Sequence, residues 1–183
     1  MLHMNQINYS IFNQLLIRPN HIRGLAKAIS SNQTSVSRKI NELYEENIVD
    51  YRKEGKNKVF YIKKNTESRL FTFIVETKKV MDTLNKYPRL RRIIDTIKKD
   101  HRIKLAVIFG SYAKGIAKED SDIDIYIDSK NNLIKQELSM LDSKLSIKLG
   151  RYDKSNLLIK EIEKSHIIIK GVERFYEKNK LLE

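Results

Sequence analysis

The sequence predicts an α+β protein with two small domains and a helical connector between them. Three observations carry this prediction: three short helical patterns followed by two strand patterns, one long helical pattern, and strands that alternate with helices to the end of the chain. They place the first domain over residues 1–66, the connector over 67–100, and a second domain with a small mixed sheet over 101–183. A length of 183 residues suits this organisation.

Three helical patterns open the first domain. Apolar residues recur at the spacing of one helix face within residues 11–16, 22–29 and 36–43. Pro19 ends the first pattern, and a Ser-Ser-Asn turn supplies N-cap candidates for the third helix, which we expect to start near Gln33. The expected order is therefore helix, helix, turn, helix.

The third helix has a polar outer face, and a basic hairpin follows it. Short polar side chains at the start of such a helix can reach base edges in a major groove, and cations can meet phosphate or guanine. Residues 48–52 and 59–62 predict two strands, with residues 53–58 as a tight basic tip. The residues expected to bind DNA are Gln33, Thr34, Ser35, Ser37, Arg38, Lys39, Asn41, Arg52, Lys53, Lys56 and Lys58.

The order helix, helix, turn, helix, hairpin over residues 7–63 resembles the winged helix-turn-helix regulators. Residues 23–30 and 34–43 look like the two core helices of that family. The resemblance implies binding to double-stranded DNA, commonly as a dimer. A winged helix that contacts protein in place of DNA is the alternative.

The positive charge of the chain is concentrated outside the second domain. The net charge is +13, and residues 1–66 carry 11 basic and 5 acidic side chains, whereas residues 104–183 carry 15 and 13. This asymmetry predicts a polyanion-binding surface near the N-terminus. A generally lysine-rich, solubilising surface would give a similar excess.

The sequence of the connector predicts one long helix followed by a second, basic helix. Residues 67–86 contain neither glycine nor proline and read as a helix of roughly five turns. Residues 89–100 predict the second helix after Pro88. One apolar stripe on the first helix consists of Leu70, Ile74, Met81 and Leu84, with Phe71 and Val75 beside it. We expect this stripe to pack between domains or between the subunits of a homodimer, or simply on the first domain.

The segment between two predicted strands of the second domain has the parts of a metal–triphosphate site. Residues 105–109 predict a buried strand, and Gly110 and Ser111 predict the turn after it. A glycine lets phosphate approach the backbone, and serine can donate to its oxygens. Asp122 and Asp124 alternate along the next strand, with Cα atoms roughly 6.5 Å apart. Two carboxylates at this spacing can share Mg²⁺.

The pattern Gly-Ser-x3-Gly-x5-Ser-Asp-x-Asp resembles the signature of the DNA polymerase beta-like nucleotidyltransferases, particularly their minimal members. The resemblance implies that ATP or another nucleoside triphosphate is bound, and that Asp122 and Asp124 are the catalytic and metal-binding residues. The nucleotide-binding residues expected from the motif and its charge are Gly110, Ser111, Lys114, Gly115 and Ser121. The alternative is a solvated strand face after an ordinary turn.

A third carboxylate that the family places on the neighbouring strand is missing. The matching strand is 145–149, and its outward positions are Ser146 and Lys148. Two functions therefore stay open. One is a DNA-binding, Mg²⁺-dependent enzyme that transfers a nucleotidyl group to a hydroxyl, with a protein among the possible acceptors. The other is a transcriptional regulator whose inactive nucleotidyltransferase-like domain senses nucleotide or dimerises.

Composition excludes several other classes of protein. The chain has no cysteine, so disulfides and thiolate metal sites are ruled out, and its four histidines are scattered. No apolar run approaches the roughly 20 residues that span a bilayer. The first residues lack the basic and apolar regions of a signal peptide. We therefore expect a cytoplasmic protein without membrane contact.

Overall fold

The computed structural model describes residues 5–179. The chain divides into an N-terminal unit that ends at Val75 and a C-terminal unit from Glu76 to Asn179. The N-terminal unit has a three-stranded sheet and the C-terminal unit a four-stranded one, each with helices around it. The expected mixture of helices and small sheets is thus confirmed. Within residues 5–179, no helix has the length and apolar character needed to cross a membrane.

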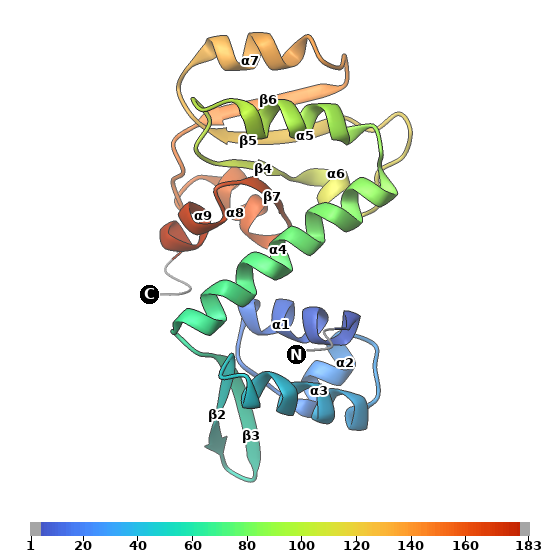
Figure 1. Cartoon of the computed structure of the whole chain (residues 1–183), viewed down its shortest axis with the longest axis vertical. Coiled ribbons are helices and arrows are strands. Elements are labelled where there is room, and N and C mark those ends of the chain that lie inside the picture. The colour runs from blue at the N-terminus through green and yellow to red at the C-terminus, as the bar shows by residue number, and fades with distance from the viewer. Residues whose placement is uncertain (1–4, 180–183) are drawn as a thin grey trace. The chain divides into compact units, whose positions relative to one another are not determined.

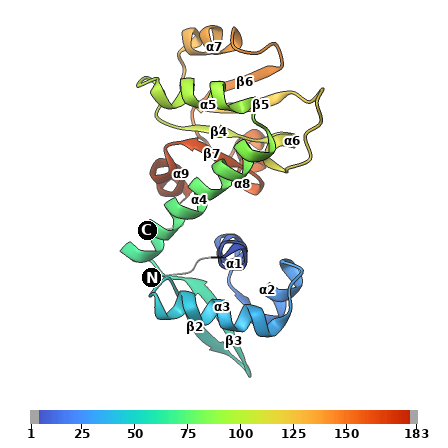
Figure 2. The ribbon, with the colours of Figure 1, turned by 45° about the vertical axis from the view of Figure 1, so that its right-hand side comes forward.

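The N-terminal unit combines helices and a short strand with a β-hairpin. The helices and the hairpin can be followed in Figure 2. Its elements are α1 (Gln6–Ile17), β1 (Asn20–His21), α2 (Ile22–Ala28), α3 (Gln33–Glu45), β2 (Val49–Glu54), β3 (Asn57–Ile62) and the start of α4 (Thr66–Lys86). Asn32 caps α3 because its side chain accepts from the Ser35 N–H at 2.7 Å. The two-residue β1, which the sequence pattern does not reveal, pairs antiparallel with β3.

The hairpin turns more tightly than the sequence predicts. β2 continues to Glu54 and β3 begins at Asn57, so only Gly55 and Lys56 form the turn between them. Gly55 has φ +59°, as the first central residue of a two-residue hairpin turn of type II′ requires. Most of the expected tip is therefore paired strand, which holds Lys53 and Lys58 on a regular ladder.

The buried face of α4 is not the one expected. The predicted stripe is exposed at Leu70, Ile74 and Met81, and only Leu84 packs against a core. Polar residues are buried on the neighbouring face because their hydroxyls are bonded. Ser68 Oγ donates to the Ile48 carbonyl at 2.7 Å, and Thr72 Oγ1 donates to the Ser68 carbonyl at 2.8 Å. Phe71 and Val75, which the sequence placed beside the predicted stripe, are buried on this face.

The C-terminal unit has a mixed sheet in the order β6-β5-β4-β7. After α4, its elements are α5 (Leu90–Lys99), β4 (Ala106–Ile108), α6 (Gly110–Ala113), β5 (Ile123–Asp128), α7 (Asn132–Ser139), β6 (Leu145–Gly150), α8 (Leu157–Lys164), β7 (Ile167–Lys170) and α9 (Val172–Asn179). β5 and β6 are parallel and joined through α7, and the other pairs are antiparallel. The connection fits the helical crossover that parallel strands need.

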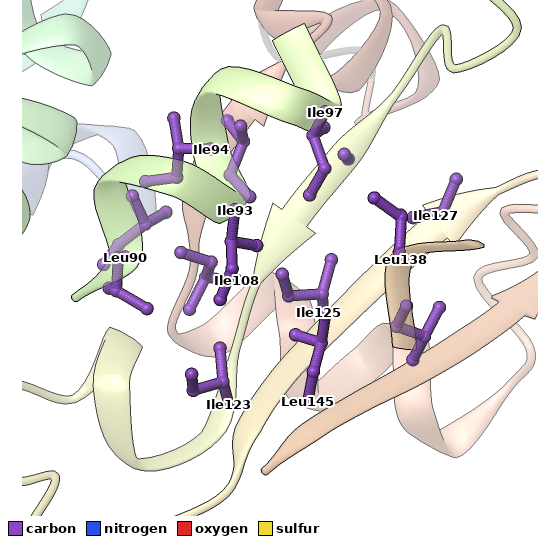
Figure 3. Close-up of a cluster of buried hydrophobic side chains, with 14 of the residues drawn as sticks. Leu90, Ile93, Ile94, Ile97, Ile108, Ile123, Ile125, Ile127, Leu138 and Leu145 are labelled. Carbon is purple, nitrogen blue, oxygen red and sulfur yellow. The ribbon is translucent and has the colours of Figure 1, made fainter. Parts of the chain in front are cut away.

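One face of this sheet is covered by α5 and α7 (Figures 1 and 3). Figure 3 shows Leu90, Ile93, Ile94 and Ile97 of α5 pointing toward the apolar residues of β4 and β5, with Leu138 of α7 in the same cluster. The cluster also includes Ile108, Ile123, Ile125, Ile127, Leu145 and Ile147. Alternation along the strands leaves the polar positions of β5 and β6 on the opposite face.

The opposite face carries an aromatic chain. Tyr126 stands on it beside its ladder partner Val107, and both are buried. Ring contacts run from Tyr126 to Tyr152, from Tyr152 to Phe175, and from Phe175 to Tyr176 on α9. Since Asp124 precedes Tyr126 by two residues on β5, its side chain lies on this same face.

Candidate active site

A turn after β4 brings Gly110 against Asp124. Gly110 has φ +68°, a left-handed conformation that glycine adopts without steric cost. A Cβ atom at this position would lie 2.5 Å from Asp124 Oδ2. The Phe109 N–H donates to the Asp124 carbonyl at 3.0 Å, which continues the pairing of β4 with β5 and fixes the approach. The glycine turn and one carboxylate of the motif therefore lie side by side.

Gly110→Ala is expected to lower the free energy of unfolding of the C-terminal unit by about 2–4 kcal/mol. The left-handed backbone costs a residue with a Cβ about 1–2 kcal/mol, and displacing the Asp124 carboxylate adds to this. Hydrogen exchange of the β4 and β5 amides measures the loss. Gly115→Ala is the control, because Gly115 has φ +70° but its nearest neighbour is the flexible Lys86 Nζ at 3.8 Å. Equal losses in both variants would contradict the close approach of Asp124.

The environment of Asp124 disfavours its negative charge. Burial is the main cause that raises the pKa of Asp124, and the neighbouring Asp122 and Glu161 carboxylates raise it further. A hydrogen bond from Ser146, its ladder partner on β6, and the charge of Lys148 act in the opposite direction. A bound cation would favour the charged form of this carboxylate.

Asp122 lies just before β5 and not on it. β5 begins at Ile123, and the Asp122 side chain is exposed. Its charge acts on Asp124, so the two carboxylates are electrostatic neighbours. Within residues 5–179, no three His, Cys, Asp or Glu side chains form a group able to hold a metal ion. A pair of carboxylates nevertheless suits Mg²⁺, which commonly takes one or two carboxylates together with substrate phosphates.

The loop between α6 and β5 carries the other residues expected to bind nucleotide. Lys114 ends the α6 turn, and its Nζ lies 3.7 Å from Glu161 Oε1. Gly115 continues it with φ +70°. Ser121 Oγ accepts from the Lys118 N–H at 2.9 Å, so this side chain closes a turn within its own loop. Gly110 is thus the member of this set whose backbone closely approaches a carboxylate of the Asp-x-Asp pair.

Three cations that sequence reasoning missed hold the same loop. Lys86 donates to the Gly115 carbonyl at 2.6 Å, and both Arg89 and Lys144 donate to the Glu119 carbonyl, at 3.3 and 2.8 Å. The groups that they hold in this loop are backbone carbonyls, which leave no signature in a sequence, and Arg89 also pairs with the Asp142 carboxylate at 2.8 Å. The sequence also did not indicate that Glu161 lies near this loop. The apolar face of α8 indicates only that Glu161, on the other side of that helix, is a surface residue.

In the N-terminal unit, most of the expected DNA-binding residues of α3 are accessible. Those that are exposed or half-buried are Gln33, Thr34, Ser35, Ser37, Arg38 and Asn41. Lys39 differs from the expectation, because it is only 7% exposed and its ammonium pairs with Glu42 at 2.7 Å. Asn8 donates to the Glu42 carboxylate and to the Lys39 carbonyl, so Lys39 belongs to a partly buried network that links α1 and α3.

The hairpin presents basic side chains to solvent. Lys53 and Lys58 are directly opposite each other on the ladder, and Lys56 lies in the turn. Lys58 Nζ sits 4.1 Å from the centroid of the Tyr51 ring. Arg52, also expected to bind DNA, pairs with Glu54 at 2.7 Å on the exposed surface. Neighbouring lysines of like charge destabilise a ladder, and a polyanion would relieve that repulsion.

Residues 91–180 match the family model described as Polymerase beta, Nucleotidyltransferase. The matched stretch contains the Gly110 turn, both carboxylates and the whole four-stranded sheet. The chain is also similar to a Methanocaldococcus jannaschii protein named "Putative protein adenylyltransferase", with 41% identity over 61 residues. That alignment covers 33% of this chain and 62% of the relative's length. Together these similarities support nucleotidyl transfer generally as the chemistry of the C-terminal unit.

Proposed function

We propose that the protein is a Mg²⁺-dependent nucleotidyltransferase that uses ATP or another nucleoside triphosphate and carries a DNA-binding winged helix-turn-helix. The observation that carries the enzymatic part is the approach of Asp124 Oδ2 to Gly110, within 2.5 Å of where a Cβ would stand. It puts a carboxylate that can hold Mg²⁺ directly beside the glycine turn that would contact the triphosphate. The name of the M. jannaschii relative suggests a protein as the acceptor, and we propose that a side-chain hydroxyl of that protein receives the nucleotidyl group.

Each residue of the site has a role in this reaction. Gly110 gives a phosphate access to the backbone, and Ser111 donates hydrogen bonds to its oxygens. Lys114 adds positive charge beside the triphosphate. Asp122 and Asp124 would hold Mg²⁺, which when bound neutralises phosphate charge and polarises the α-phosphorus. The acceptor oxygen then attacks the α-phosphorus, and pyrophosphate leaves.

Radiolabelled ATP tests the reaction class. The protein is incubated with Mg²⁺, a library of peptides that contain serine, threonine and tyrosine, and ATP labelled at either the α or the γ phosphorus. Nucleotidyl transfer puts the α label on peptide and releases the γ label as pyrophosphate. Transfer of the γ label to peptide would instead show phosphoryl transfer and contradict the proposal.

A second function has its own support in the N-terminal unit. The accessible polar face of α3 and the three exposed hairpin lysines, Lys53, Lys56 and Lys58, suit a helix in the major groove and a wing along the phosphate backbone. The alternative regulator, with an inactive nucleotide-sensing or dimerising domain, is favoured by the missing carboxylate on β6. It predicts ATP binding without label transfer, and the exposed Leu70, Ile74 and Met81 would supply a dimer contact.

The double variant Arg38→Ala/Lys56→Ala is expected to weaken DNA binding about 10–100-fold at low salt. Each lost phosphate contact should also lower the slope of log affinity against log salt by about 0.9. Fluorescence anisotropy with duplex DNA at several salt concentrations measures both quantities. Lys64→Ala, which removes an exposed cation outside α3 and the hairpin, is the control. Binding that responds equally to both changes would argue against a winged helix contact.

A further inference from the structure

Glu161 brings a carboxylate to the Asp124 site from a helix outside the sheet. Its helix, α8, is anchored by the buried side chains of Ile159 and Ile162, and the Glu161 side chain is 53% exposed. Glu161 Oε1 lies 3.7 Å from Lys114 Nζ, on the loop that follows the Gly110 turn. Its charge also acts on Asp124. Glu161 therefore stands at the edge of the site, within reach of a molecule bound there.

The strand that neighbours β5, β6, places no carboxylate opposite Asp124 or Tyr126. Ser146 stands opposite Asp124 on β6, and Lys148 stands opposite Tyr126. The Glu161 side chain is 53% exposed and its carboxylate pairs with Lys114, so a hydroxyl group that enters from solvent can reach it. Its pairing with Lys114 is half-exposed, and such ion pairs are weak enough for a triphosphate to displace.

We propose that Glu161 accepts the proton of the acceptor hydroxyl during nucleotidyl transfer. This inference rests on the proposed function and adds the acceptor side of the same site. Binding of the triphosphate draws Lys114 toward phosphate oxygens and leaves the Glu161 carboxylate unpaired. The freed carboxylate then lies at the edge of the site, where its charge acts on Asp124 and where a side chain of another protein can enter from solvent.

The step balances without a further reactant. The acceptor O–H transfers its proton to a Glu161 oxygen while the acceptor oxygen forms a bond to the α-phosphorus of ATP. The bond between the α-phosphorus and the bridging oxygen breaks, and its electron pair leaves with pyrophosphate. Glu161 then passes the proton to water, and the products are the adenylylated acceptor and pyrophosphate.

Substitution of Glu161 together with chemical rescue tests this role. With α-labelled ATP, Mg²⁺ and the hydroxyl-containing peptide library, Glu161→Ala and Glu161→Gln should each transfer label about 10²–10⁴-fold more slowly than wild type. Added formate should restore part of the rate of Glu161→Ala but not of Glu161→Gln, whose side chain fills the place. ATP affinity should not weaken in either variant. Glu173→Gln, an exposed carboxylate on α9, should behave as wild type.

The outcomes separate this inference from the proposed function. Wild-type protein that transfers no label overturns both. Wild-type protein that transfers label at the same rate as the Glu161 variants overturns only the role of Glu161. A slow Glu161→Ala that formate does not restore assigns Glu161 to positioning Lys114, and contradicts proton transfer.

Discussion

Replacing both Asp122 and Asp124 by asparagine is expected to lower the rate of nucleotidyl transfer from ATP at least about a thousandfold. The two carboxylates are the groups that suit a divalent cation beside Gly110, and neutral amides hold Mg²⁺ and its triphosphate poorly. Metal-based charge stabilisation contributes several kcal/mol, and about 4 kcal/mol corresponds to a thousandfold. Initial rates of transfer from α-labelled ATP measure the effect.

A matched control keeps this loss apart from unfolding. Asp95→Asn removes an exposed carboxylate from α5, which covers the other face of the sheet, and should retain the wild-type rate. Because burial raises the pKa of Asp124, its charged form destabilises the folded unit once the pH exceeds the unfolded pKa, and removal of the charge should relieve this. The double variant should therefore be as stable as wild type or more so. A double variant that transfers label at the wild-type rate would contradict the proposed site.

Gly171→Ala is expected to lower the free energy of unfolding of the C-terminal unit by about 2–5 kcal/mol. Gly171 has φ +81°, and a Cβ there would lie 2.2 Å from the Lys104 carbonyl oxygen and 3.1 Å from Leu105 Cα. Both neighbours are backbone atoms, so no side-chain rotation can make room, and the strands β4 and β7 would have to move apart. The left-handed conformation contributes about 1–2 kcal/mol and the overpacking about 1–3 kcal/mol.

Urea unfolding monitored by near-ultraviolet circular dichroism of the buried tyrosines reports this loss for the C-terminal unit. Gly150→Ala is a useful comparison, because a methyl group added at Gly150 would meet no atom within 4 Å and the residue has no positive φ. It should stay within about 1 kcal/mol of wild type. Similar losses in the two variants would mean that the turn at Gly171 can relax, contrary to the close backbone contact.

Capping residues, prolines and apolar periodicity in the sequence were sufficient to predict most of the helices and strands. Pro19 ends the first helical pattern through its restricted backbone, and Asn32 caps α3 through its side-chain oxygen. The apolar face of α5 repeats regularly enough to identify its buried residues. The β1 strand and the burial of Ser68 on α4 were missed for a different reason. Two residues of β1 carry no periodicity, and Ser68 is buried only because a distant carbonyl, that of Ile48, accepts its hydrogen bond.

The residues of the candidate site also fall into those that local sequence signals indicate and those that depend on distant contacts. A spacing motif indicated Gly110, Asp122 and Asp124, since a left-handed turn and alternating acids are encoded locally. The motif could not indicate Glu161, which reaches the site only through the packing of α8, nor the loop cation Lys86, whose partner is a backbone carbonyl. Lys39 shows the reverse case, where a side chain that looks free in sequence is held by Glu42.

The aromatic chain beside the sheet has a spectroscopic consequence. Burial is the main cause that raises the pKa of Tyr126, Tyr152 and Tyr176 above the ordinary value for tyrosine. Freely hydrated phenols ionise near about pH 10, so these three should hold their protons to higher alkalinity and release them when the surrounding structure opens. Phenolate absorbance during an alkaline titration would thus follow the melting of this half of the chain, without the tryptophan that the sequence lacks.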